Sequence, residues 1–381
     1  MESSVSNISS ERPEISKASL PAKLGTFFDY LFGLLVIVLS LAAISAIPII
    51  HFFSLGYLLE ASARVARSGR FRDGLIGLKP ASRIGKVIVA GWFIFLPIRL
   101  LYSYWVDAEI LVPQGEAGRF LGGMLLFLSS ICVLGMIWAI MRGGKFRHFL
   151  WAAPIRFFRW LGEPKQLPRF SGLSGLQSRF KLFDYFKLGF LGFLGGALWL
   201  LIPTSLLFLA PSIPIQPLSL LVSLIGGIIL AVVILYLPFV QTRFALSRKF
   251  STFRDWRSVR QGFRRAPLAL WVALVITLLF ALPLYVLKIE LAPQEVAWIP
   301  NLVFVAFMFP ARLLLGWATS RSMKSEMNRH WIFRILGRIG MLPAAAVYVF
   351  VVWISQYLSW HGSYSLLEQH AFLLPAPMLG L

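Results

Sequence analysis

The sequence predicts an all-α integral membrane protein, a polytopic bundle of about eight spanning helices. The first observation is composition: the 381 residues are 58% hydrophobic and only 14% charged, whereas soluble proteins carry roughly 25% charged residues. The second is that the hydrophobic residues gather into eight runs of about 20 residues, the length that crosses a hydrocarbon core of about 30 Å as a helix. The third is that basic residues are concentrated between those runs.

The eight predicted spans have ends that such patterns place to within about 2–4 residues. All but the third contain a proline or end on one, and an interior proline bends a helix. We interpret these prolines mainly as kinks, although broken helices also line the binding sites of transporters. The predicted spans are Phe27–Ile50, Ile84–Val106, Phe120–Met141, Leu188–Ala210, Leu218–Val240, Pro267–Leu287, Trp298–Ala318 and Ile339–Leu358.

The basic residues predict an orientation. If eight spans alternate, the loops on one side hold 30 lysines and arginines and those on the other side hold 5. Cytoplasmic loops of membrane proteins carry the excess of lysine and arginine. We therefore expect the basic loops in the cytoplasm, both termini outside it, and a multi-pass protein of the cell (plasma or inner) membrane. The net charge of +21 is explained by this topology, and we expect no nucleic-acid partner.

The predicted domain organisation is simple. Residues 1–25 form a serine-rich tail, residues 26–358 the helical bundle with its basic loops, and residues 359–381 a short non-cytoplasmic tail. The loops leave no room for a separate soluble domain. After the first span, the run from Gly56 to Ala61 is expected to continue helically into Arg64 and Arg67 and to stop at Gly69.

Two basic loops contain amphipathic segments, 145–161 and 253–265. At 100° per residue their aromatic and basic residues fall on opposite faces, as in helices that lie in the headgroup plane. Anionic phospholipid headgroups are therefore the expected partners, besides the bilayer itself and other membrane proteins. Docking of a partner protein and specific lipid sensing remain alternatives. The candidate lipid contacts are Lys145, Arg156, Arg159, Arg254, Arg257 and Arg264.

Three charged residues within predicted spans are candidate functional residues: Arg99, Arg312 and Asp29. Arg99 and Arg312 share the local pattern Pro-x-Arg-Leu-Leu, and a charge within a span is a functional candidate because it is costly there. Each lies near enough to one end of its helix to reach the surface by snorkelling. We favour snorkelling or pairing inside the bundle over substrate binding. Asp29 is expected at the outer start of the first span, where a helix N-terminus favours a carboxylate.

No constellation of catalytic residues is visible in the sequence. The five histidines are scattered, and neither metal-binding spacing nor a phosphate-binding or nucleophile motif occurs. The single cysteine, Cys132, leaves the redox compartment undetermined. We expect no enzyme activity, no cofactor and no metal.

A faint repeat relates the two halves. Phe71-Arg72-Asp73 lies between Pro48 and Pro97, and Phe253-Arg254-Asp255 lies between Pro238 and Pro283. Both sets run in the same direction, which fits a parallel duplication that would pair the first span with the fifth.

Short motifs resemble an uncharacterised family of prokaryotic polytopic membrane proteins, a domain of unknown function. They are Gly56-Tyr57-Leu58-Leu59, Tyr236-Leu237-Pro238-Phe239 and Arg243-Phe244-Ala245. The resemblance implies a helical bundle in a prokaryotic plasma membrane and brings no catalytic residues with it. The first functional hypothesis is a non-enzymatic scaffold, assembly factor or envelope component. A transporter or permease is the alternative, and a lipid-modifying enzyme is the least favoured.

Overall fold

The structure is a computed structural model that describes residues 20–142, 148, 182–286, 298–359 and 362–368. Within these residues the chain forms helices and no strand. Eight helices are long and apolar enough to cross a membrane. The predicted class, an all-α multi-pass membrane protein with eight candidate spans, is therefore confirmed.

The eight apolar helices are in most cases longer than the predicted spans, because polar turns at their ends continue the helical hydrogen bonding. In chain order they are α1 (Leu20–Ser45), α3 (Leu78–Leu111), α4 (Glu116–Met141), α8 (Leu182–Leu209), α9 (Gln216–Ser247), α11 (Pro267–Val286), α12 (Trp298–Lys324) and α13 (Trp331–Leu358). After α13 the chain forms η6 (Gly362–Tyr364) and α14 (Ser365–Glu368), where Leu366 is buried.

Helix α2 (His51–Ser68) lies at the centre of the bundle. It starts after a turn in which Ile49 has a φ of 67°, and it ends at Gly69, whose φ of 80° suits glycine. Thirteen of its 18 residues are buried, and it contacts α8, α9 and α12. The helix predicted to end at Gly69 is confirmed, but it is a separate core element and does not extend the first span.

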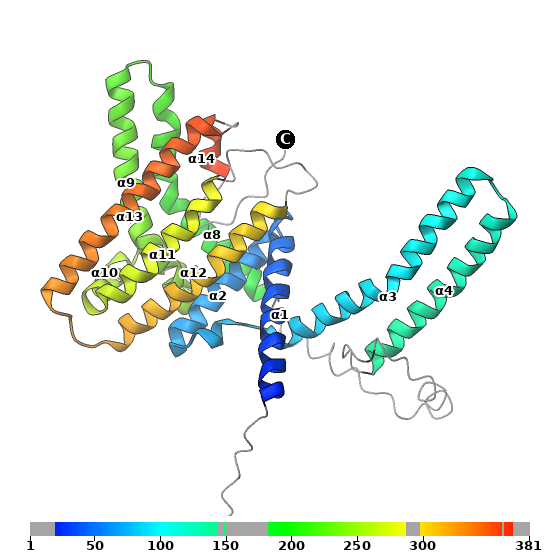
Figure 1. Cartoon of the computed structure of the whole chain (residues 1–381). Coiled ribbons are helices and arrows are strands. Elements are labelled where there is room, and N and C mark those ends of the chain that lie inside the picture. Colours follow the sequence, from blue (N-terminus) through cyan, green and yellow to red (C-terminus); the bar gives the residue numbers. More distant parts are fainter. Residues whose placement is uncertain (1–19, 143–147, 149–181, 287–297, 360–361, 369–381) are drawn as a thin grey trace, which may run out of the picture.

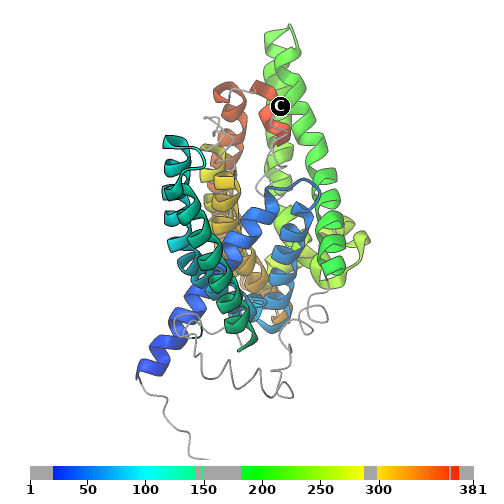
Figure 2. The same ribbon diagram turned by 90° about the vertical axis from the view of Figure 1, so that its right-hand side faces the viewer.

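Because α2 runs back beside α1, the first two spans are parallel to each other. The amino end of α1 lies at the same end of the molecule as the turn between α2 and α3, whereas α13 ends at the opposite end (Figures 1 and 2). Contacts agree with this, since Tyr30 of α1 lies 3.3 Å from the guanidinium of Arg72 in η1 (Phe71–Gly74). The prediction that both termini share one side is therefore wrong for these helices. The error arose because α2 is too polar to count as a span.

Glycine lets the backbones around α2 approach very closely. A Cβ added to Gly56 would lie 1.8 Å from the carbonyl oxygen of Tyr185 in α8, and one added to Gly316 would lie 2.3 Å from that of Ser62. Small residues at helix crossings are typical of membrane bundles, where packing rather than the hydrophobic effect drives helix association. The axis of the bundle is consequently filled by side chains of α2, several of which are fully buried: Leu55, Leu58, Leu59, Ala61, Ala63 and Val65.

Helices α3 and α4 form a hairpin that leans away from the other helices (Figure 1). We call it the arm. In the most apolar stretch of each helix, only 17% of the α3 residues and 11% of the α4 residues are buried, against 61% in α12. Besides α4, the helix that α3 chiefly contacts is α1. Apart from the side of α3 that contacts α1, the described residues of the arm pack little against the bundle.

Two turns share one conformation. After α2, left-handed Gly69 leads into η1, and after α9, Arg248 with a φ of 58° leads into η4 (Phe250–Arg254). In a repeat that relates these two turns, α2 corresponds to α9, whereas the spacing of the prolines predicted that α1 corresponds to α9. Six identities around the turns follow a constant offset of 179 residues: Tyr57/Tyr236, Leu58/Leu237, Arg64/Arg243, Ala66/Ala245, Ser68/Ser247 and Phe71/Phe250.

Candidate functional site

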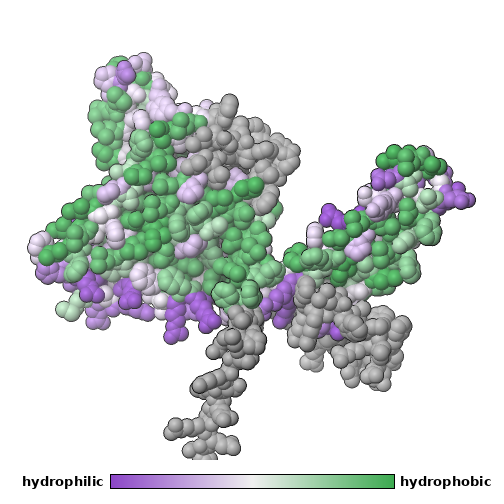
Figure 3. All heavy atoms as spheres, viewed as in Figure 1, coloured by the Kyte–Doolittle hydropathy of each residue, from purple (hydrophilic) through white to green (hydrophobic). Residues whose placement is uncertain are grey.

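The charged residues gather at one end of the bundle. In the space-filling view a hydrophilic band runs along the lower edge, beneath a wide hydrophobic belt (Figure 3). The turns after α2, α9 and α12 all lie at this end, as does α10 (Trp256–Arg265) (Figure 1). We call it the basic end, and it is the candidate functional site.

Glu60 of α2 organises the centre of the basic end. Its side chain is 9% exposed, and among the described carboxylates it is the one that is buried. One oxygen, Oε1, accepts hydrogen bonds from Arg64 Nε and Arg67 Nη2, both at 3.0 Å. The other, Oε2, pairs with Arg248 of α9. A buried carboxylate needs such partners, because an uncompensated buried charge costs several kcal/mol.

Arg248 holds an unusual backbone conformation for this contact. In the turn after α2 the left-handed position is occupied by Gly69. In the turn after α9 it is occupied by Arg248, for which this backbone conformation costs about 1–2 kcal/mol. The side chain thereby ties α9 to α2. A cavity of about 530 Å³ opens beside the pair and contains both signs of charge, with Asp184 and Lys187 among its lining residues. Such a cavity suits a polar headgroup or a charged segment of a partner.

Helix α10 is amphipathic, as predicted. Asp255 caps its amino end: its carboxylate accepts from the Ser258 hydroxyl, and from the Ser258 backbone N–H at 3.2 Å. These hydrogen bonds hold the pKa of Asp255 below its ordinary value. Arg254, Arg257 and Arg264 are exposed.

The apolar face of α10, however, does not lie free in a headgroup layer. Val259 is 2% exposed and Phe263 is 9% exposed, and the Phe263 ring meets the ring of Phe239 edge-on at 5.4 Å. Phe253, just before α10, is buried as well, and its ring lies 4.9 Å, centre to centre, from the ring of buried Phe244. Only Trp256, 43% exposed, keeps the position expected of an interfacial aromatic. The helix is therefore docked on the bundle, and its arginines remain available to ligands.

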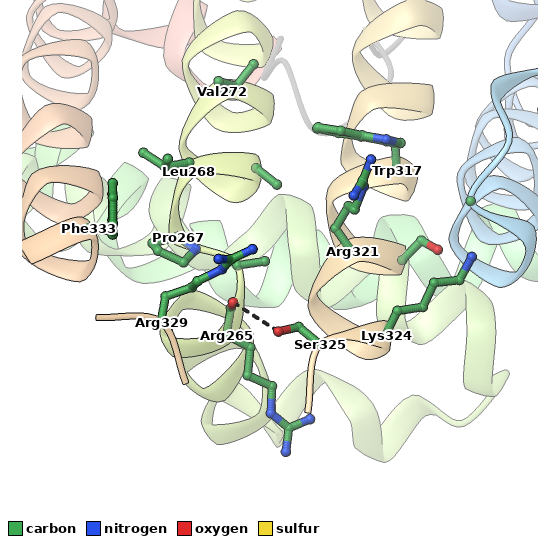
Figure 4. A pocket seen from close by; sticks show the side chains of 14 residues that line it. Arg265, Pro267, Leu268, Val272, Trp317, Arg321, Lys324, Ser325, Arg329 and Phe333 are labelled. Atoms are coloured by element: carbon green, nitrogen blue, oxygen red, sulfur yellow. Dashed lines mark hydrogen bonds between the residues drawn. The ribbon is translucent and has the colours of Figure 1, made fainter. Parts of the chain in front are cut away.

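A second cavity, of about 770 Å³, lies between α11, α12 and α13. We call it the cationic cleft. Its rim carries Arg265, Arg321, Lys324 and Arg329, and none of its described lining residues is acidic. Its wall is apolar, with Leu268, Val272, Trp317 and Phe333 on the three helices (Figure 4).

The three intramembrane charges occupy unrelated places. Arg99 is exposed on the arm, and its snorkelling stays a prediction. Arg312 is 1% exposed within α12, which lies inside the bundle; of the two expected alternatives, this burial argues against snorkelling and leaves pairing inside the bundle. Asp29 forms an ion pair with Lys86 of α3; it lies at the basic end and not at the outer end as predicted.

The structure describes only half of the predicted lipid contacts, and these three, Arg254, Arg257 and Arg264, lie on α10 or just before it. Lys145, Arg156 and Arg159 lie outside the described residues. Among the described residues no group of three or more histidine, cysteine, aspartate or glutamate side chains could hold a metal ion. The sequence analysis missed Glu60 and the cationic cleft. The spacing of Glu60, Arg64 and Arg67 along one helix face was a signal for the first, whereas the cleft is assembled from three helices.

Comparison with known proteins adds no relative: no protein-family model, no curated protein and no solved structure matches this chain.

Proposed function

We propose that this chain is a non-enzymatic scaffold or assembly component of a prokaryotic plasma membrane, with its basic end in the cytoplasm. The packed centre of the bundle supports this function most directly. A permease needs a pathway along its axis, and here α2 occupies the axis with side chains such as Leu58 and Ala61 that have no exposed surface. The resemblance of the Gly56–Leu59 motif to a prokaryotic membrane family supports the choice of membrane.

The arm is the part of the molecule that would hold a partner. Its two helices bury little of their surface against the bundle, and they present large apolar side chains such as Phe127, which is 69% exposed. In lipid, helices associate through close packing and polar contacts. The arm therefore offers a long surface to a partner's spanning helix, and the arginines of α10 offer anionic headgroups a second anchor.

Cysteine accessibility tests whether the centre is sealed. In a Cys132→Ser background, Ala61→Cys and Ala311→Cys place thiols at positions with no exposed surface. Glu116→Cys and Asn328→Cys place exposed thiols near the two ends of the molecule. In native vesicles a charged thiol reagent should modify the two exposed controls and spare the two buried sites. Modification of Ala311→Cys in a folded variant would show water inside the bundle and contradict the proposal.

Site-specific photocrosslinking tests the arm. A photoreactive amino acid in place of Phe127 should give discrete protein adducts in native membranes. Leu220 of α9, 60% exposed, is the matched control on the bundle and should give lipid adducts only. The same lipid-only pattern at both positions would argue against a scaffold.

A permease is the second candidate because of Arg312. A guanidinium buried at 1% exposure within a spanning helix is a functional candidate by default. The accessibility of Ala311→Cys, its neighbour in the chain, decides between the two functions.

A further inference from the structure

The cationic cleft joins two surfaces that rarely meet in one cavity. Its wall is formed by apolar side chains at the start of α11 and α13, and its rim carries four cations. Leu268 and Val272 are one helical turn apart on α11, which extends the apolar wall along the span. The cavity therefore suits a ligand that carries a negative charge at one end and a hydrocarbon at the other.

The positive charges at the rim of the cleft are not neutralised by described carboxylates. None of the four forms an ion pair with a described acidic residue. Arg321 lies over the Trp317 ring, 5.5 Å from its centre, and Lys324 donates to the Ser68 carbonyl oxygen at 3.1 Å. In Figure 4 the guanidinium of Arg329 lies over Pro267, between the two side walls, whereas Arg265 points away from the apolar wall. Arg329 and Arg321 are thus the pair that faces the cavity.

The cleft lies where two candidate spans end, which is where a headgroup layer is expected. The α11 span begins at Pro267 and the α12 span ends at Lys324, and both residues line the cleft. A lipid that enters sideways would place its acyl chain against Leu268, Val272 and Phe333 and its phosphate beside Arg321 and Arg329. Arginine suits this role because its planar fork binds phosphate oxygens in pairs.

We propose that the cationic cleft is a binding site for one anionic membrane phospholipid, held by its phosphate through Arg321 and Arg329. This inference rests on the proposed placement of the basic end in the headgroup layer, but it does not depend on a partner for the arm. It differs from the diffuse attraction of the α10 arginines because the lipid is enclosed on three sides by helices.

Native mass spectrometry of the delipidated full chain tests this site, with dioleoyl-phosphatidylglycerol, dioleoyl-phosphatidylcholine and sodium phosphate as separate probes. The chain should retain one phosphatidylglycerol in preference to phosphatidylcholine and should not retain inorganic phosphate. Each basic residue near an anionic lipid contributes roughly 1 kcal/mol, so Arg321→Gln combined with Arg329→Gln should weaken that binding by about 30-fold.

The matched control is Arg260→Gln combined with Arg338→Gln, which removes the same charge from exposed positions outside the cleft. It should weaken binding less than threefold. Ala269→Trp fills the cleft without a change of charge, and it should also abolish retention of the single lipid.

Three outcomes would overturn the site. Equal losses in the two glutamine pairs would show diffuse surface attraction, and undiminished binding by a folded Ala269→Trp variant would place the lipid elsewhere. Retention of inorganic phosphate as strong as that of phosphatidylglycerol would mean that the cleft takes a soluble anion. None of these results bears on the sealed centre or on the arm, so this inference and the proposed function can fail separately.

Discussion

Replacement of Glu60 by glutamine should destabilise the bundle more than any other single loss of a carboxylate at the basic end. The substitution keeps the shape of the side chain but removes the charge that Arg64, Arg67 and Arg248 share. Because both oxygens of Glu60 accept from arginines, the glutamine amide NH₂ would also face at least one guanidinium N–H, and two hydrogen-bond donors cannot bind each other.

The structure sets the size of the effect. The carboxylate is 9% exposed but its three partners are 43–51% exposed, so each pair resembles a surface ion pair more than a buried one. Exposed pairs contribute 0.2–1 kcal/mol, and three of them give roughly 2 kcal/mol. The loss should be close to that value and well below the 3–5 kcal/mol of a fully buried pair.

Unfolding by sodium dodecyl sulfate in mixed micelles measures this change. Glu326→Gln is the matched control, because that carboxylate is exposed in the loop after α12, and it should change the free energy of unfolding by less than about 0.5 kcal/mol. A double-mutant cycle with Arg248→Gln should return a coupling energy above about 0.5 kcal/mol. If Glu60→Gln and Glu326→Gln have equal effects, the reasoning about the buried carboxylate is refuted.

Four further predictions follow from the fold. Gly56→Ala should cost about 1–3 kcal/mol by overpacking, since its Cβ would overlap the Tyr185 carbonyl, whereas Gly123→Ala, with nothing within 4 Å, should be neutral in the same unfolding assay. Reporter fusions at Met1 and Leu381 should report opposite sides of the membrane; the same side for both would contradict the parallel arrangement of α1 and α3. Asp255→Ala should speed amide hydrogen exchange in α10, because loss of an N-cap costs about 1 kcal/mol. Since hydrogen bonding lowers the pKa of Asp255, the cap should stabilise α10 above the unfolded pKa of about 3.9 and fade as pH falls through the lower folded value; protection that persists in acid would refute this. Arg99→Lys should leave thermal stability in detergent unchanged, whereas Arg312→Lys should lower it, because the fork of Arg312 sits in closed space and lysine cannot reproduce it; equal melting temperatures would show that burial of Arg312 is immaterial.

The sequence by itself determined the class of this protein, the eight apolar helices and the concentration of positive charge at one end. These properties are readable because hydrophobic length and loop charge are local, and the bilayer imposes them on each span separately. The amphipathic pattern of α10 and the stop at Gly69 were readable for the same reason, since a helix face and a cap each involve a few consecutive residues.

Tertiary structure alone decided where α2 lies, and with it the direction of α1 and the environment of the charged residues. By hydropathy, the segment that contains Glu60 and two arginines is assigned to a loop. It can nevertheless pack in the core, because Gly189 of α8 and Gly316 of α12 allow the backbones of these helices to lie close to α2. Burial of Arg312 and exposure of Arg99 depend on which helices surround α12 and the arm, and no local pattern contains that information. The cationic cleft needs three helices at once, so its cations and its apolar wall become one site only when α11, α12 and α13 are packed together.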